Sequence, residues 1–131
     1  MAERRILVTG ASSGIGAATC RTLAGPGTAI AVHARANREG AERTAAEVRA
    51  RGGRAMVLLA DLALPEAPAR LVAAAVAALG GLDVIVANAG FADRTPVAGL
   101  DDARFARSLD LVAWGFLRLA RAARPHLLAG A

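Results

Sequence analysis

The chain has 131 residues, 55% of them hydrophobic, and a formal net charge of +5, which fits a single globular domain over residues 1–131. No apolar run reaches the roughly 18 residues of a membrane span, and the first predicted strand begins too early for a signal peptide, so we expect a cytoplasmic protein without a membrane partner. All sixteen basic residues are arginines, scattered without interleaved aromatics, which argues against a nucleic-acid partner.

Strands and helices alternate along the sequence, and glycine or proline separates most of them. Short apolar runs predict strands over residues 5–9, 28–34, 55–59 and 82–88. Helices are predicted over residues 15–24 and 39–51, from Pro65 to the Gly80-Gly81 pair, and after Asp101, whose side chain suits an N-cap. The single cysteine, Cys20, lies in the first helix and is expected to be a small buried hydrophobe.

The last predicted helix has the clearest apolar periodicity. Its hydrophobic positions recur at steps of four and three and therefore share one face: Phe105, Leu109, Val112, Phe116 and Leu119. Trp114 lies off this face and is interpreted as a packing or interface residue. The alternation of apolar strands with helices predicts an α/β fold, in which a parallel sheet has helices on both faces. Right-handed crossovers then give the strand order 3-2-1-4.

A glycine-rich turn, TGASSGIG at residues 9–16, joins the first strand to the first helix. In this context Gly10 permits a tight turn, Gly14 lets the backbone approach a pyrophosphate, and Gly16 allows the helix to lie close to the strand. Free N–H groups at the start of a helix attract anionic oxygens, so the turn predicts a phosphate site. The alternative is a tight turn with no ligand.

A second motif, Asn88-Ala89-Gly90, ends the fourth strand. Together with the G-x-x-x-G-x-G spacing of the first motif, it resembles the short-chain dehydrogenase/reductase family, and the resemblance runs from Arg4 to about His126. It implies a Rossmann-like doubly wound sheet in three layers, α/β/α, truncated here after the fourth strand and its helix. A dinucleotide would lie across the carboxyl ends of the strands, at the reversal of strand order.

The residues after the second strand bear on the form of the cofactor. A binder of NAD(H) usually places a carboxylate there to accept from the ribose 2′-OH, but no carboxylate occurs before Glu39. Arg35 instead suits a 2′-phosphate, so we predict NADP(H) over NAD(H). Alternatively, Arg35 and Arg38 are solvated loop charges.

The resemblance also implies roles for residues farther along. Asp61 would accept from the adenine amino group beside the backbone of Leu62, although it could instead cap the next helix. Asn88 would hold neighbouring strands by side-chain hydrogen bonds. His33 is interpreted as a strand-end residue without chemistry, or as a neighbour of the adenosine, and His126 as structural. The expected cofactor contacts are Gly10, Ser12, Ser13, Gly14, Ile15, Gly16, Arg35, Asp61, Leu62, Asn88, Ala89 and Gly90.

The catalytic groups of the family have no counterpart here. Its members transfer a hydride between nicotinamide and a carbonyl/alcohol pair with a tyrosine, a lysine, a serine and a relay asparagine. This chain has no tyrosine and no lysine, and Val112 stands in the place of the asparagine. We therefore expect no catalytic residue and no metal site, and predict that the chain alone is inactive.

Two interpretations remain open. The chain is either the cofactor half of a longer reductase or a non-catalytic nucleotide-binding module or pseudoenzyme. In the first case the fourth strand is an uncovered edge and the last helix lacks part of its cover. Homo-oligomerisation is expected, because the family associates through helices near the last one here.

Overall fold

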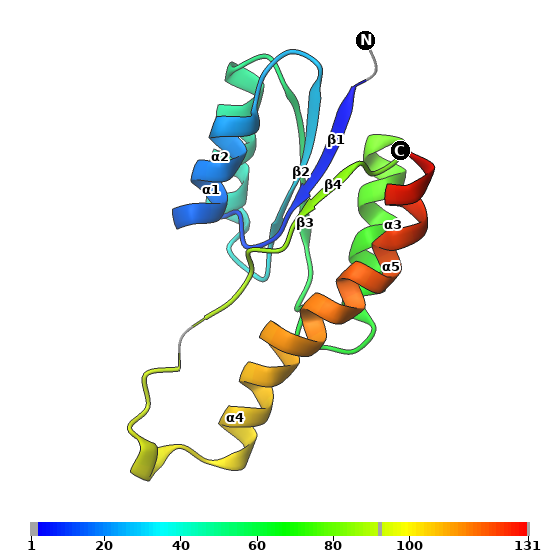
Figure 1. Cartoon of the computed structure of the whole chain (residues 1–131). Helices are drawn as coiled ribbons and strands as arrows, with labels where there is room; N and C mark the ends of the chain where they lie inside the picture. The colour runs from blue at the N-terminus through cyan, green and yellow to red at the C-terminus, as the bar shows by residue number, and fades with distance from the viewer. Residues whose placement is uncertain (1–2, 92, 131) are drawn as a thin grey trace.

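A computed structural model describes residues 3–91 and 93–130 as a four-stranded parallel sheet flanked by helices (Figure 1). The strand order is β3-β2-β1-β4, as predicted, so the order reverses beside β1. The strands are β1 (Arg4–Val8), β2 (Thr28–Ala34), β3 (Arg54–Leu59) and β4 (Val84–Val86). The predicted Rossmann-like fold class is thus confirmed.

Helices cover both faces of the sheet, which gives the three layers (Figure 1). Those on one face are α1 (Gly14–Leu23) and α2 (Arg38–Ala50). On the other face lie α3 (Ala67–Leu79) and α5 (Gly115–Ala129). Between β4 and α5 the chain forms a short 3-10 turn η1 (Val97–Gly99), α4 (Asp102–Leu109) and a π-helical turn η2 (Asp110–Trp114). Figure 1 shows α4 lying beyond the end of the sheet.

The core has two parts, one on each side of the sheet. Successive strand residues point to opposite faces, so Ile6 and Val8 of β1 pack towards α1 and α2, whereas Leu7 packs towards α3 and α5. Cys20 is fully buried in the first part, as expected. No helix among the described residues is long and apolar enough to cross a membrane.

Several predicted boundaries were wrong. Strand β4 has three residues rather than seven, because the chain beyond it makes hydrogen bonds to Thr9 instead of continuing the ladder. Helix α3 begins at Ala67 rather than Pro65, after a turn in which Ala67 N–H donates to Leu64 O (3.2 Å). Its first-turn proline is Pro68.

The last helix also differs from the prediction. It is divided by η2, where five residues form a π-helical turn that changes the register of the apolar face. Of the five hydrophobic residues expected on this face, Leu119 alone is buried, and the others are each more than 40% exposed. Trp114 is also exposed, and its ring lies 5.1 Å from the Arg118 guanidinium.

Candidate functional site

The glycine turn leaves the sheet at the point where the strand order reverses. Gly10 and Gly14 have positive φ angles of 64° and 55°, a region that side chains disfavour. At Gly16 an added Cβ would lie 2.7 Å from Asn88 Nδ2 and closer still to the carbonyl oxygen of Gly10. The absence of side chains at Gly10 and Gly16 therefore lets α1 start directly against the end of β1.

The turn presents unbonded amides to solvent. The first backbone hydrogen bond of α1 runs from Ala17 N–H to Ser13 O (3.2 Å), so the amides of residues 14–16 have no acceptor within the helix. Ser13 is the N-cap, but its side chain makes no capping hydrogen bond. A Cβ at Gly14 would meet nothing within 4 Å, so no other part of the chain packs against this side of Gly14. Free amides at a helix start are a typical site for an anionic ligand.

A cleft of about 270 Å³ lies beside this turn, across the carboxyl ends of the strands. Phe91 and Leu111 supply apolar surface to its wall. The cleft brings together eight of the residues predicted to contact a cofactor: Gly10, Ser12, Ser13, Arg35, Asp61, Leu62, Ala89 and Gly90. Gly14, Ile15, Gly16 and Asn88 do not line it, and Ile15 is 78% exposed.

Asn88 acts behind the cleft rather than in its wall. Its Nδ2 donates to Thr9 O (3.2 Å) and Gly10 O (3.1 Å), the kind of strand-to-strand contact that the resemblance implied. Thr9, which sequence reasoning did not single out, completes the connection. The Oγ1 of Thr9 accepts hydrogen bonds from the N–H groups of Asn88 and Ala89, each at 3.0 Å. These contacts fix the start of the glycine turn against the end of β4.

His33 has more contacts than a simple strand-end residue would have. It is buried at the end of β2, and Gly10 N–H donates to its Nδ1 (3.0 Å). Its Nε2 lies 2.9 Å from Ala60 O at the end of β3. Burial lowers the pKa of His33, partly offset by the hydrogen bond to Ala60. His33 thus lies at the end of its strand, as predicted, and its ring in addition connects the ends of three strands.

Arg35 and Asp61 supply the charge of the cleft. Arg35 is exposed at the end of β2, and Asp61 follows β3. Asp61 Oδ1 accepts from Ala63 N–H (3.1 Å) in a local turn, and its Oδ2 lies 3.6 Å from Arg107 Nη2 on α4. The N-cap of α3 is Glu66, so the alternative in which Asp61 caps this helix was wrong.

Towards α5, the cleft shares Leu62, Ala89 and Leu111 with a smaller cavity. Val112 lies in η2 and is half exposed. It lines a cavity of about 110 Å³ with Thr9, Ala89 and Phe116, and none of the residues around that cavity is ionisable. Among residues 3–91 and 93–130, no group of three His, Cys, Asp or Glu side chains could hold a metal ion.

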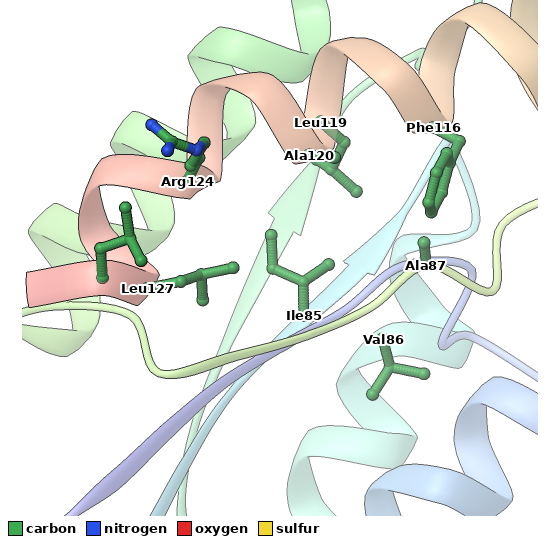
Figure 2. Close-up of a pocket in the computed structure, with 9 residues that line it drawn as sticks. Ile85, Val86, Ala87, Phe116, Leu119, Ala120, Arg124 and Leu127 are labelled. Carbon is green, nitrogen blue, oxygen red and sulfur yellow. The ribbon is translucent and has the colours of Figure 1, made fainter. Parts of the chain in front are cut away.

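A larger apolar groove, of about 680 Å³, runs along β4 and α5 (Figure 2). Strand β4 pairs with β1 and forms the edge of the sheet. Figure 2 shows Ile85 pointing towards α5, whereas Val86 points to the other face of the sheet. Arg124 carries the one charge in the lining, which otherwise consists of aliphatic side chains and Phe116.

Comparison with known proteins relates these features to a family. A model of the short chain dehydrogenase family matches residues 4–131. The cis-4-hydroxycyclohexanecarboxylate dehydrogenase of Sinomonas cyclohexanicum is 40% identical over 129 residues, which are 98% of this chain and 51% of that protein.

Two solved structures are similar in fold. A short chain dehydrogenase from Burkholderia cenocepacia J2315 in complex with NADP is 35% identical, with a TM-score of 0.90 over 95% of this chain and 51% of the other. The NADH-dependent reductase A1-R′ complexed with NAD is 33% identical, with a TM-score of 0.89. The match covers 99% of this chain and 54% of the reductase. The chain thus spans about half the length of these relatives. With this similarity over nearly its whole length, the protein belongs to the short-chain dehydrogenase family.

Proposed function

We propose that this chain binds a nicotinamide dinucleotide in the cleft beside the glycine turn, and that the cofactor is NADP(H). The amides of residues 14–16, which lie at the start of α1 beside the cleft rather than in its lining, would receive the diphosphate. The small residues Ala89 and Gly90 leave room for a ribose in the cleft itself. The observation that carries this proposal is the convergence of both sequence motifs on one cleft. When bound, the nicotinamide would supply or accept a hydride.

Arg35 carries the preference for NADP(H). Its guanidinium lines the cleft from the end of β2, where a carboxylate would repel a 2′-phosphate. Relatives bind either form, since the Burkholderia cenocepacia enzyme is in complex with NADP and the reductase A1-R′ with NAD. The preference of this chain therefore depends on its own residues.

Replacement of Arg35 by aspartate tests the preference. We expect the Arg35→Asp variant to bind NADP+ about tenfold or more weakly by calorimetric titration, because a charge-assisted contact is lost and a repulsion is gained. Binding of NAD+ should be equal or tighter. The variant Arg51→Asp makes the same charge change at the opposite end of α2 and should leave both affinities unchanged. An unaltered ratio of NADP+ to NAD+ affinity in Arg35→Asp would contradict the phosphate role.

For the whole protein we propose an NADP(H)-dependent oxidoreductase acting on a carbonyl/alcohol pair, of which this chain is the cofactor half. The groove along β4 supports this, because an edge strand beside an apolar groove suits a further strand of a longer polypeptide. The half-length match to the relatives agrees with it. By itself the chain should not oxidise NADPH, and turnover above the protein-free rate with a panel of carbonyl compounds would overturn this.

A non-catalytic nucleotide-binding module is the second candidate. The observation in its favour is Val112, which stands where the family has its relay asparagine and cannot carry a proton. The two candidates differ in one readout. A polypeptide that extends this chain by a Tyr-x-x-x-Lys segment should reduce a carbonyl with NADPH if the first candidate holds, and should bind NADPH without turnover if the second does.

A further inference from the structure

The ring of His33 connects the glycine turn to the end of another strand. Gly10 N–H donates to His33 Nδ1 (3.0 Å), and His33 Nε2 lies 2.9 Å from Ala60 O. The backbone carbonyl oxygen of His33 also accepts from Ala11 N–H (2.7 Å). One buried residue thus holds two successive amides of the turn, one through its side chain and one through its backbone.

These two partners determine the protonation state of the ring. A backbone N–H can only donate, so Nδ1 must be an unprotonated acceptor. A carbonyl oxygen can only accept, so Nε2 must carry the proton. The contacts are therefore satisfied together only by the neutral Nε2–H tautomer, and a proton added at Nδ1 would oppose the Gly10 amide.

We propose that His33 is a positioning residue for dinucleotide binding, which holds Gly10 in the conformation that opens the phosphate site and does so only while its ring is neutral. The inference deepens the proposed function and rests on it. Gly10 is the pivot of the turn, because its φ of 64° directs the chain from β1 towards the open amides at the start of α1. Without the hydrogen bond to His33, Gly10 would be less ordered in the free protein. Ligand binding would then have to order it, and this entropic cost would lower the affinity.

The surroundings of the ring favour its neutral form. Burial lowers the pKa of His33, and the hydrogen bond to Ala60 opposes that shift. The charged groups that line the same cleft are Arg35 and Asp61, and Asp61 lies 3.6 Å from Arg107. Protonation at low pH therefore costs the burial of a charge as well as the bond to Gly10.

Three substitutions separate the two ring contacts. His33→Asn keeps an acceptor near the position of Nδ1, His33→Gln keeps a donor near the position of Nε2, and His33→Phe keeps neither. At pH 7.5 we expect the dissociation constant for NADP+, measured by calorimetry, to rise about tenfold in His33→Phe and His33→Gln and to recover in His33→Asn. A residue needed only for stability would give no such difference between the asparagine and glutamine variants.

The pH dependence gives a second readout. Between pH 7.5 and 5.5 the wild-type affinity should fall more steeply than that of His33→Asn, whose side chain does not titrate. The phosphate of the cofactor also titrates in this range, but it affects the wild type and His33→Asn equally, so the difference between their pH profiles reports on His33. In parallel, the amide resonance of Gly10 in a 1H–15N spectrum should move with pH in the wild type and stay in place in His33→Asn.

The outcomes distinguish this inference from the proposed function. If the wild-type chain does not bind NADP+ at all, the proposed function fails and the inference falls with it. If the wild type binds but His33→Phe binds equally well, or asparagine restores no more than glutamine, the proposed function stands and the role of His33 is overturned. Identical pH profiles for the wild type and His33→Asn would also overturn it.

Discussion

The strand order reverses beside β1, and the strands on its two sides, β2 and β4, differ in how completely they are buried. Strand β2, on the side of β1 away from β4, is buried along nearly its whole length, and Ile30, Ala31 and Val32 have no exposed surface. On the other side, all three residues of β4 are partly exposed, and Phe116 of α5 is 59% exposed. The proposed diphosphate site lies between these two strands, and on the side of β2 it rests against a buried strand.

This difference indicates which half of the site the chain builds by itself. The residues that would hold the diphosphate and the adenosine follow β1, β2 and β3. Helices cover β1 and β2, whereas β3 is the opposite edge of the sheet, where Met56 and Leu59 are more than a third exposed. On the far side of β1, the apolar groove runs along β4 and α5. Contiguous exposed apolar surface of this kind marks an interaction site more often than a free surface.

Two substitutions by alanine, one on each side, should show this difference in burial most strongly. Ile30→Ala removes a fully buried side chain between β1 and β3, and should lower the free energy of unfolding by about 3 kcal/mol. Phe116→Ala removes a larger side chain that is mostly exposed, and should cost less than about 1 kcal/mol. Urea denaturation followed by circular dichroism measures both. Equal losses would mean that the groove side is packed in solution, for example by association.

Close packing at the glycine turn can be tested in the same way. Gly16→Ala places a Cβ against Asn88 Nδ2 and the carbonyl of Gly10, so we expect a loss of about 2 kcal/mol. Gly25→Ala is the matched control, because its added Cβ would meet nothing within 4 Å and its φ is not positive. A Gly16→Ala variant as stable as Gly25→Ala would contradict the close approach of α1 to β1.

Much of this arrangement could be predicted because it follows from local patterns. Apolar runs located the strands, and the glycine spacing located the turn, so the strand order followed from the alternation of strands and helices. The eight residues of the cleft were named from the two motifs together with the resemblance to the short-chain dehydrogenase/reductase family. The central place of β2 required no contact information, because right-handed crossovers with helices on both faces give the doubly wound strand order.

Contacts between distant residues could not be predicted in this way. His33 meets Gly10 and Ala60, and Thr9 meets Asn88, across sequence separations that no local pattern records. The π-helical turn η2 was missed for another reason. Its residues continue a helical period, and the extra residue in the turn became evident only from the backbone hydrogen bonds.

The smallest expected effect on stability comes from the polar contacts between β1 and the residue just before the edge strand β4. Asp83, just before β4, accepts hydrogen bonds from Arg5 N–H (2.9 Å), Nε (3.0 Å) and Nη2 (2.9 Å). These bonds to Arg5 lower the pKa of the Asp83 carboxyl to about 2. The ionised form is therefore favoured by folding, and its contribution is complete above the ordinary value near 3.8 and is lost as the pH falls towards 2.

Replacement of Asp83 by asparagine should remove that dependence. At neutral pH we expect a cost of about 1 kcal/mol, because the pair is partly exposed to solvent. Between pH 4 and 2 the stability of the wild type should fall more steeply than that of Asp83→Asn in urea denaturation. Asp102→Asn makes the same charge change on the exposed start of α4 and should keep the wild-type slope. If Asp83→Asn keeps that slope too, the polar attachment of β4 carries no stability, and the edge is held by its short ladder to β1 alone.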